Sequence, residues 1–488
     1  MLNTPNVRLG IIAVKKESFN ISHMSKRRQK VATCLQEMGI DIVECSTIVQ
    51  NEIDAVKALK DIQGINALVI YLADFGPEGP ATMMAQRFNG PVMFIGAAEE
   101  NEEGLKDSRR DAYAGMLSMS YNMALRNIKP YIPPCPIGTP EECALMIKNF
   151  YNVARVYIGI KRLKIITFGP RPQDFYSCNA PIKALFNLGV EIEENSELDL
   201  YQSYRQHQGD PRIEEVVQEM YEELGDNCIY PEILPKLAAF ELTLLDWYLE
   251  HRGVSKFAIF ANKCWPAFEK EFGFVPCYVN SRLTMKGIPV ACEVDIYGVL
   301  SEFMLQLASM SPVTLLDISS NIPDDLYREI ITDYKRSDLF LGYHCGNTAS
   351  CLIKNPALKY QQTMHSHIEP DNEPEITKGT LEGTIKPSDI TLFRLMADHE
   401  GRLKSYIAEG EILDEEPKTY GSAGIFAISE MARFYRYALI EKNFPHHTGV
   451  AFSRVGKLLY EVLKMLNVSD ISTNNPKDKL YPTENIFS

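Results

Sequence analysis

Residues 288–298 read Ile-Pro-Val-Ala-Cys-Glu-Val-Asp-Ile-Tyr-Gly, and Glu293 closes the apolar half of this stretch. Asp317 closes the run Val-Thr-Leu-Leu-Asp in the same way, and His344 follows the run Leu-Phe-Leu-Gly-Tyr. Open α/β sheets bind ligands just outside the carboxyl ends of their strands. The region from Pro289 to Asn347 therefore predicts an α/β fold with a divalent-metal site at a sheet edge.

The first third of the chain alternates short β-branched runs with amphipathic stretches of helical period. Strands separated by helices of this length indicate βαβ units and a parallel sheet, so the first domain is predicted to be Rossmann-like and doubly wound. The predicted strands are 7–14, 41–45, 67–74 and 91–96, and the predicted helices are 25–38, 52–62, 80–88, 116–127 and 140–159.

The pattern of predicted strands and helices changes twice further along the chain. After Arg162 a new strand opens with Leu-Lys-Ile-Ile-Thr-Phe-Gly, and another is predicted over 256–262, so a second α/β domain begins at residue 163. Beyond about Leu352 the predicted strands are short, closely spaced and separated by Gly, Pro and Asn, which is typical of an antiparallel sheet or barrel. Helices are predicted near 428–443 and 454–466.

Composition excludes several classes of function. The chain has 488 residues, 45% hydrophobic and 23% charged, which is typical of a soluble globular protein of two to four domains. A formal net charge of −14 opposes a broad nucleic-acid or anionic-membrane surface. The eleven cysteines form no Cys-x-x-Cys pair, and no signal peptide or membrane span is recognised, so a cytoplasmic protein with reduced thiols is expected.

Glu293 and Asp317 are the leading candidates for chemistry. They are 24 residues apart, which leaves room for one helix over 296–308 to bring both acids to one edge. Each acid alone could simply cap a helix or end a strand, and Asp295 is a rival to Glu293. Carboxylates together with an imidazole suit Mg²⁺ or Mn²⁺ and leave positions open for substrate oxygens.

The histidines leave alternatives open. His446 and His447 are adjacent, so an extended backbone would turn only one of them towards a metal, and the other would contact substrate or a ligand. A plain surface loop explains the pair about as well. His365 and His367 could chelate from one strand face, but no acid flanks them at a matching spacing.

Four segments together resemble the L-fucose isomerase and L-arabinose isomerase superfamily. The stretch Pro-Val-Ala-Cys-Glu-x-Asp-x-Tyr-Gly within 281–298 is similar to the fucose isomerase segment, and His446-His-Thr is more similar to the arabinose enzyme. The other two segments are Leu-Leu-Asp317 and His344-Cys-Gly-Asn347. The resemblance extends broadly over the chain.

The resemblance implies a set of site residues. Glu293 and Asp317 correspond to the acids that bind the metal and transfer the proton, and His447 corresponds to the C-terminal histidine ligand. His344 stands where the arabinose branch supplies a further histidine ligand. His446 and Asn347 are then expected to bind the substrate. The implied metal is Mn²⁺, with Mg²⁺ or Co²⁺ as alternatives.

The resemblance also implies an architecture and an activity. It places a boundary near Ser309, so the expected domains are 1–162 and 163–308, both α/β, and 309–488, an α+β domain with an antiparallel barrel. The expected activity is aldose–ketose isomerisation of an unphosphorylated sugar such as L-fucose, L-arabinose or D-arabinose through a cis-enediol, in a homo-oligomer of hexamer type. The alternatives are a metal-dependent aldolase or epimerase and a non-catalytic sugar-binding protein.

Overall fold

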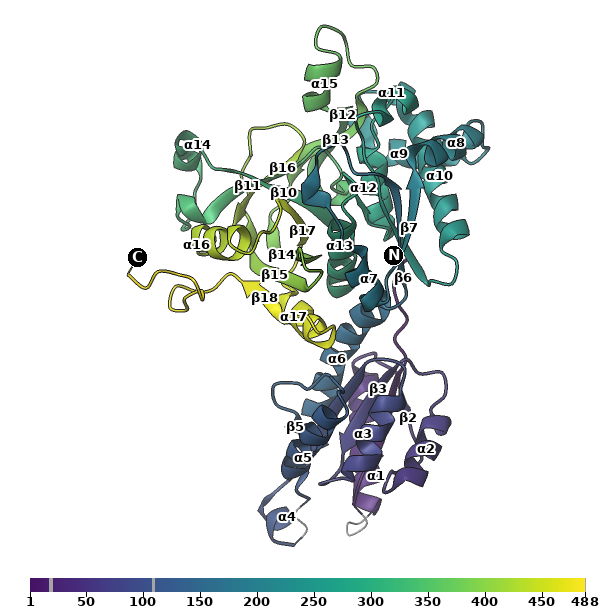
Figure 1. The fold of residues 1–488 in the computed structure, drawn as a ribbon, viewed down its shortest axis with the longest axis vertical. Helices are drawn as coiled ribbons and strands as arrows, with labels where there is room; N and C mark the ends of the chain where they lie inside the picture. Colours follow the sequence, from purple (N-terminus) through teal and green to yellow (C-terminus); the bar gives the residue numbers. More distant parts are fainter. Residues whose placement is uncertain (17–20, 108–109, 488) are drawn as a thin grey trace. The chain divides into compact units, whose positions relative to one another are not determined.

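The chain folds into two compact units, which the computed structural model describes for residues 1–16, 21–107 and 110–487 (Figure 1). The N-terminal unit comprises Pro5–Ile158 and Glu461–Asn467, and the main unit comprises the rest of the described chain. Every candidate site residue lies in the main unit.

The N-terminal unit is built on a five-stranded parallel sheet of order β2-β1-β3-β4-β5. Strands β1, β3 and β4 are buried along their whole length, as expected for a parallel sheet with helices on both faces. The strands are β1 (Leu9–Val14), β2 (Ile42–Glu44), β3 (Ala67–Leu72), β4 (Val92–Ala97) and β5 (Ile137–Gly138), and the helices are α1 (Ile21–Glu37), α2 (Glu52–Asp61), α3 (Glu78–Arg87), α4 (Glu102–Asp107), α5 (Ala112–Leu125) and α6 (Pro140–Ile160).

The main unit begins with a second parallel sheet, of order β7-β6-β8-β9. Helix α10 is buried deeply against it, in an aromatic core that includes Phe168, Phe240 and Phe260. The strands are β6 (Leu163–Gly169), β7 (Glu191–Ser196), β8 (Phe257–Ala261) and β9 (Val290–Ala291), and the helices are α7 (Ile182–Leu188), α8 (Glu197–His207), α9 (Ile213–Leu224), α10 (Leu234–His251), α11 (Phe268–Phe272) and α12 (Cys277–Lys286).

A nine-stranded sheet forms the rest of the main unit, in the order β12-β13-β16-β11-β10-β17-β14-β15-β18. An additional β15–β16 pairing closes six of these strands into a ring. The strands are β10 (Val313–Asn321), β11 (Leu339–His344), β12 (Ile353–Tyr360), β13 (Lys378–Ile385), β14 (Ser388–Ala397), β15 (Leu403–Ile412), β16 (Ser422–Ala427), β17 (His447–Ala451) and β18 (Asp470–Thr473), and the helices are α14 (Asp324–Glu329), α15 (Gln362–Ile368), α16 (Met431–Arg433) and the π-helix η6 (Phe434–Ile440). Helix α17 (Gly456–Met465) begins in the main unit, and its residues from Glu461 onwards belong to the N-terminal unit.

Helix α13 (Ile296–Ser309) links the two sheets of the main unit. Its residues are buried from Ile296 to Ala308, because it packs on β10, β14 and β17 of the ring and on β8 and β9 of the parallel sheet. A helix with apolar side chains on every side is stable only in such a core, and in α13 the polar residues Ser301, Glu302 and Gln306 are buried with them. Asp295 caps it by accepting a hydrogen bond from the Gly298 N–H at 2.8 Å. A Cβ at Gly298 would lie 2.4 Å from the Asp295 carboxylate, so this cap requires glycine.

The predicted α/β class, the two parallel sheets and the helix between the two acids are confirmed. Two details of the prediction were wrong. The C-terminal sheet is mixed, because the β13–β16 and β15–β18 pairs are parallel. Asp317 lies inside β10, because the polar residues up to Asn321 continue to pair with β11 across a register shift. The three-domain division stays a prediction.

Among the helices of the described ranges, none has the length and apolar character needed to cross a membrane.

The packing of α13 predicts a large cost for truncating one of its side chains. Leu305→Ala should lower the free energy of unfolding of the main unit by about 2–5 kcal/mol, because it opens a cavity in a fully buried position. Urea denaturation followed by tryptophan fluorescence measures this unit, since both Trp247 and Trp265 belong to it. Leu249→Ala, at a side chain that is 62% exposed, is the control. Equal effects of the two substitutions would contradict the role of α13.

Candidate active site

Four elements of the main unit bring the predicted site residues together. Glu293 lies in the turn between β9 and α13, and His344 ends β11. Strand β10 pairs with both β11 and β17, and in that register Asp317 lies directly opposite His447. Opposed residues of antiparallel strands extend to the same face of the sheet. The register therefore fixes the contact between an acid and an imidazole that are 130 residues apart in the sequence.

The side chains form two groups of potential ligands that share the imidazole of His447. The Nε2 atom of His447 lies 3.4 Å from Asp317 Oδ1 and 3.7 Å from Glu293 Oε2. His344 Nε2 lies 3.9 Å from the same Glu293 oxygen, and His446 Nε2 lies 3.7 Å from Asp317 Oδ1. These distances are too long for direct hydrogen bonds but suit donor atoms that share a bound ion or substrate oxygen. Ligand atoms of Glu293, His344 and His447 all lie within 4.8 Å of one another, as do those of Asp317, His446 and His447.

The unpartnered oxygens of the two acids fit a divalent cation. Glu293 Oε2 and Asp317 Oδ1 are both buried, and neither has a hydrogen-bond partner among the residues that the structure describes. Leaving buried carboxylate oxygens without a partner is costly. A hard cation such as Mn²⁺ or Mg²⁺ would satisfy both of them, and it would also accept the imidazole nitrogen that they face.

A hydrogen bond behind His447 orients the imidazole for this role. Its Nδ1 atom lies 2.8 Å from Asp295 Oδ2, so Nδ1–H donates and the Nε2 lone pair faces Glu293 and Asp317. Carboxylates commonly orient metal-binding histidines in this way. Burial opposes a charge on His447, but the hydrogen bond that it donates to Asp295 raises its pKa well above the ordinary value. Without an ion the ring therefore favours a second proton on Nε2, and a bound cation would displace that proton and take the lone pair.

Arg394 neutralises the carboxylate of Asp295. It is 1% exposed, and its two terminal nitrogens donate to the two Asp295 oxygens at 2.8 and 2.9 Å. Burial would raise the pKa of Asp295, but the charge of Arg394 and the His447 hydrogen bond hold it below its usual range. Arg394 also donates to the main-chain oxygen of His447 at 3.2 Å. The ion pair thus fixes both the ring and the backbone of the histidine.

The backbone at Glu293 is in a sparsely populated conformation. Glu293 and Val294 have φ of +50° and +55°, which is unfavourable for a side chain with a Cβ and above all for a β-branched one. The turn is held because Val294 N–H donates to Asn262 O at 2.8 Å and Asp295 N–H donates to Cys292 O at 3.0 Å. Strained backbone held in this way is concentrated at functional sites, and here it directs Glu293 towards the histidines.

Residues near β6 complete the surroundings of the histidine pair. The ring of Phe175 contacts both His446 and His447, with centroids 5.5 and 5.9 Å apart. The Cys178 sulfur lies 3.8 Å from His447 Nδ1. Burial raises the pKa of this thiol, so it serves as a packed neutral group and not as a nucleophile.

The remaining candidates from the sequence are Asn347, the pair His365 and His367, and Asp295. Asn347 is 3% exposed, and neither its amide oxygen nor its amide nitrogen has a partner within the described ranges. His365 and His367 lie on helix α15, not on a strand, and neither belongs to a group of potential metal ligands among the described residues. Asp295 is the residue behind the site and does not replace Glu293.

Three residues around the site, Arg394, Phe175 and Cys178, were not predicted from the sequence. Arg394 interrupts the apolar run Ile-Thr-Leu-Phe-Arg-Leu at an inward-facing position of a predicted strand. A buried arginine requires a buried acid, so this was a usable signal, although it does not identify which acid. The two residues near β6 carried no such signal.

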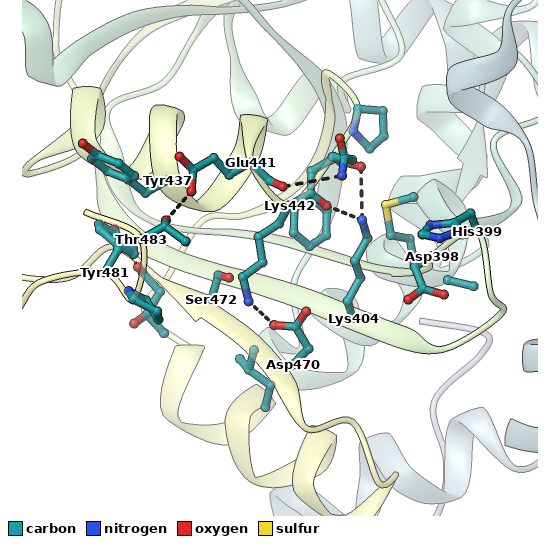
Figure 2. Close-up of a pocket in the computed structure, with 18 of the residues that line it drawn as sticks. Asp398, His399, Lys404, Tyr437, Glu441, Lys442, Asp470, Ser472, Tyr481 and Thr483 are labelled. Atoms are coloured by element: carbon teal, nitrogen blue, oxygen red, sulfur yellow. Dashed lines mark hydrogen bonds and ion pairs between the residues drawn. The ribbon is translucent and has the colours of Figure 1, made fainter. Parts of the chain in front are cut away.

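A pocket of about 1170 Å³ lies beside the segment that leads into His446 (Figure 2). Lys404 and Pro445 line it, whereas Glu293, Asp317 and His447 do not. Lys404 Nζ donates to the main-chain oxygens of Lys442 and Asn443 in the turn after η6, the latter at 3.2 Å. The ammonium group thus supplies a donor to main-chain carbonyls that need one. Lys404 thus stabilises the turn that precedes His446 and His447 in the chain.

Lys404→Met tests this role, since methionine keeps the apolar stem and removes the ammonium group. The free energy of unfolding of the main unit should fall by about 1–3 kcal/mol, because two carbonyls lose their donor. Lys457→Met, on an exposed residue, should change it by no more than about 0.5 kcal/mol. Urea denaturation measures both, and equal values would show that Lys404 does not stabilise the turn.

The buried carboxyl group of Glu302 should make the free energy of unfolding of the main unit depend on pH. It is 1% exposed on α13, and burial, followed by the charge of Asp295, raises its pKa to about 8. The folded state therefore favours the protonated carboxyl. This stabilisation is complete below the unfolded pKa of about 4.3 and is lost as the pH rises towards 8, at roughly 1.4 kcal/mol per pH unit.

Glu302→Gln mimics the protonated form and should remove this loss. The variant should match the wild type near pH 4.5 and be more stable than it at pH 8, as measured by urea denaturation in the presence of a chelator. A difference in stability that does not change with pH would contradict the assignment.

Two domain families match the chain. The N-terminal domain of fucose/sulfoquinovose isomerases matches residues 10–161, and the C-terminal domain of L-fucose isomerase matches residues 342–472. The second match includes His344, Arg394 and His447 but neither acid, so Glu293 and Asp317 rest on the geometry and the motif resemblance.

Curated relatives match over nearly the whole chain. A protein named sulfoquinovose isomerase from Priestia aryabhattai is 24% identical over 479 residues, covering 95% of this chain and 98% of the relative. One of the same name from Alkalicoccus urumqiensis is 22% identical over 469 residues, covering 94% and 97%. A third, from Clostridium sp. (strain MSTE9), is 22% identical over 476 residues, covering 92% and 96%.

Proposed function

The chain belongs to the fucose/sulfoquinovose isomerase family, and we propose that it is a metal-dependent aldose–ketose isomerase that acts on an unphosphorylated sugar through a cis-enediol. One observation carries the proposal. The unpartnered oxygens of Glu293 and Asp317 face the Nε2 lone pair of His447, whose other nitrogen is held by Asp295. Together these three residues form a ligand set for a hard divalent cation.

Glu293, Asp317 and His447 would hold the ion, because each acid has an oxygen close to His447 Nε2, at 3.7 Å for Glu293 and 3.4 Å for Asp317. His344 and His446 lie beside them, the first in a group with Glu293 and the second in a group with Asp317. Mn²⁺ is the proposed metal, because it accepts both carboxylate and imidazole ligands, with Mg²⁺ or Co²⁺ as alternatives. When bound, such an ion supplies Lewis-acid polarisation of the sugar carbonyl and hydroxyl oxygens.

The acids of the chain supply the proton transfer. The carboxylate of Glu293 or Asp317 takes the proton from C2 of the open-chain aldose and returns it to C1, while the O2 hydroxyl proton passes to O1. A carboxylate that uses one oxygen as a ligand keeps the other available as the base. No phosphate clamp is needed for an unphosphorylated sugar.

His446 and Asn347 are the proposed substrate contacts. Burial lowers the pKa of His446, which favours its neutral ring, and a neutral ring can hydrogen-bond to hydroxyl groups. The amide of Asn347 has both a donor and an acceptor that are unused by the described residues. Both groups suit recognition of sugar hydroxyls.

The substrate, the location and the assembly are proposals at the level of the family. L-fucose, L-arabinose and D-arabinose are candidate sugars, and the relatives' name adds sulfoquinovose. A cytoplasmic hexamer and the division into domains 1–162, 163–308 and 309–488 are proposed on the same basis.

An assay of these four sugars tests the function. With Mn²⁺ present, the purified protein should convert at least one of them to its ketose, and a chelator should abolish the conversion reversibly. Glu293→Gln should lower kcat by about 10²–10⁴-fold, because it removes a carboxylate base or ligand. Glu250→Gln, on the exposed end of α10, should leave kcat unchanged.

The products separate the competing functions. Cleavage of a carbon–carbon bond would support an aldolase, and inversion of a centre without a ketose would support an epimerase. Tight sugar binding with no turnover by the wild type, retained in Glu293→Gln, would support a non-catalytic binding protein. Any of these outcomes would overturn the proposed isomerase.

A further inference from the structure

The imidazole of His344 is oriented oppositely to that of His447. His344 is 3% exposed at the end of β11, and its Nδ1 atom accepts the main-chain N–H of Cys345 at 2.9 Å. The Nδ1 lone pair is therefore used. A neutral imidazole carries one proton, so in His344 that proton is on Nε2. In His447 it is on Nδ1, which donates to Asp295.

The two rings thus present different groups to the same point. His447 offers a lone pair there and His344 offers an N–H, although both Nε2 atoms lie near Glu293 Oε2. The His344 distance of 3.9 Å is too long for a hydrogen bond to the acid, so this donor is not used up by Glu293. A metal ion needs a lone pair and not an N–H, which makes His344 a poor ligand as it is oriented here.

We propose that His344 is not a metal ligand but donates its Nε2–H to the reacting oxygen of the sugar at C1 or C2. The inference rests on the proposed isomerase function. Proton removal from C2 builds negative charge on the carbonyl oxygen, and a fixed donor aimed at that oxygen stabilises the transition state. Because the Cys345 N–H holds the ring, the donor needs no reorganisation when the charge develops.

Two substitutions separate a donor from a ligand. His344→Gln places an amide N–H close to the position of Nε2, whereas His344→Ala removes the donor. His447→Gln is the matched control at the proposed ligand. The folding of all three variants is checked by comparing their melting temperatures with that of the wild type.

Mn²⁺ binding is the first measurement and requires no turnover. Titration followed by electron paramagnetic resonance should give Mn²⁺ dissociation constants for both His344 variants within about 3-fold of the wild type. The control should weaken binding at least 10-fold, in the range seen when ligand sets are disturbed. Electron spin echo modulation should report one coordinated imidazole in the wild type and in His344→Gln, and none in His447→Gln.

The second measurement is kinetic. His344→Ala should lower kcat by about 10²–10³-fold, as is typical for loss of one transition-state donor, and His344→Gln should recover at least 10-fold of that loss. Two results would overturn the inference: a 10-fold or greater loss of Mn²⁺ affinity in both His344 variants, or a glutamine variant no more active than the alanine variant.

The two proposals can fail separately. If the wild type converts no sugar, the isomerase is overturned, but the Mn²⁺ titrations still decide whether His344 is a ligand. In that case the dissociation constant of a bound sugar replaces kcat as the measure of the donor. Equal sugar affinity of the alanine, glutamine and wild-type proteins would then overturn the donor role.

Discussion

The candidate site depends on the contacts that the carboxylate of Asp295 makes. It caps helix α13, forms an ion pair with Arg394 through both of its oxygens and orients His447, and the last two contacts join residues 99 and 152 positions away. A buried ion pair is stable only when its remaining hydrogen-bonding capacity is satisfied, and removing one partner leaves an uncompensated charge. Here the pair connects the core helix to the ring strands β14 and β17, so the same contact maintains the fold and the direction of the Nε2 lone pair.

Helix α13 fixes the position of Glu293 relative to Asp317 and His447. Glu293 stands just before the helix, after a strand of the parallel sheet, whereas Asp317 and His447 belong to the ring. Their separation is fixed because α13 is packed on strands of both sheets and is buried throughout. The strained turn at Glu293 and Val294 is tolerated for the same reason. Burial of an apolar helix thus compensates for a conformation that the turn alone would not adopt.

The local elements could be predicted from the sequence, because they depend on short-range patterns. The period of the apolar residues gives the parallel strands and the helix over 296–308, and the motif around Glu293 selects that acid as a candidate. The end of β10 was predicted wrongly, because the polar residues after Asp317 are held by pairing with β11 and not by their own propensity. The Asp295–Arg394 pair could not be predicted, since it is decided by the distant strand register that places β14 beside β17.

The charge balance of the site limits what can bind beside the two acids. Asp295 is neutralised by Arg394, so Glu293, which is buried, and Asp317, which is half-buried, are the acids whose charge no lysine or arginine of the described ranges balances directly. A divalent cation would balance them, whereas an anionic substituent of a substrate placed next to the two carboxylates would be repelled by them. The proposed site therefore favours a substrate whose reacting end is neutral. A charged group on a sugar substrate would therefore be recognised by residues away from Glu293 and Asp317. Such residues can vary without changing the proton transfer that the two acids would carry out.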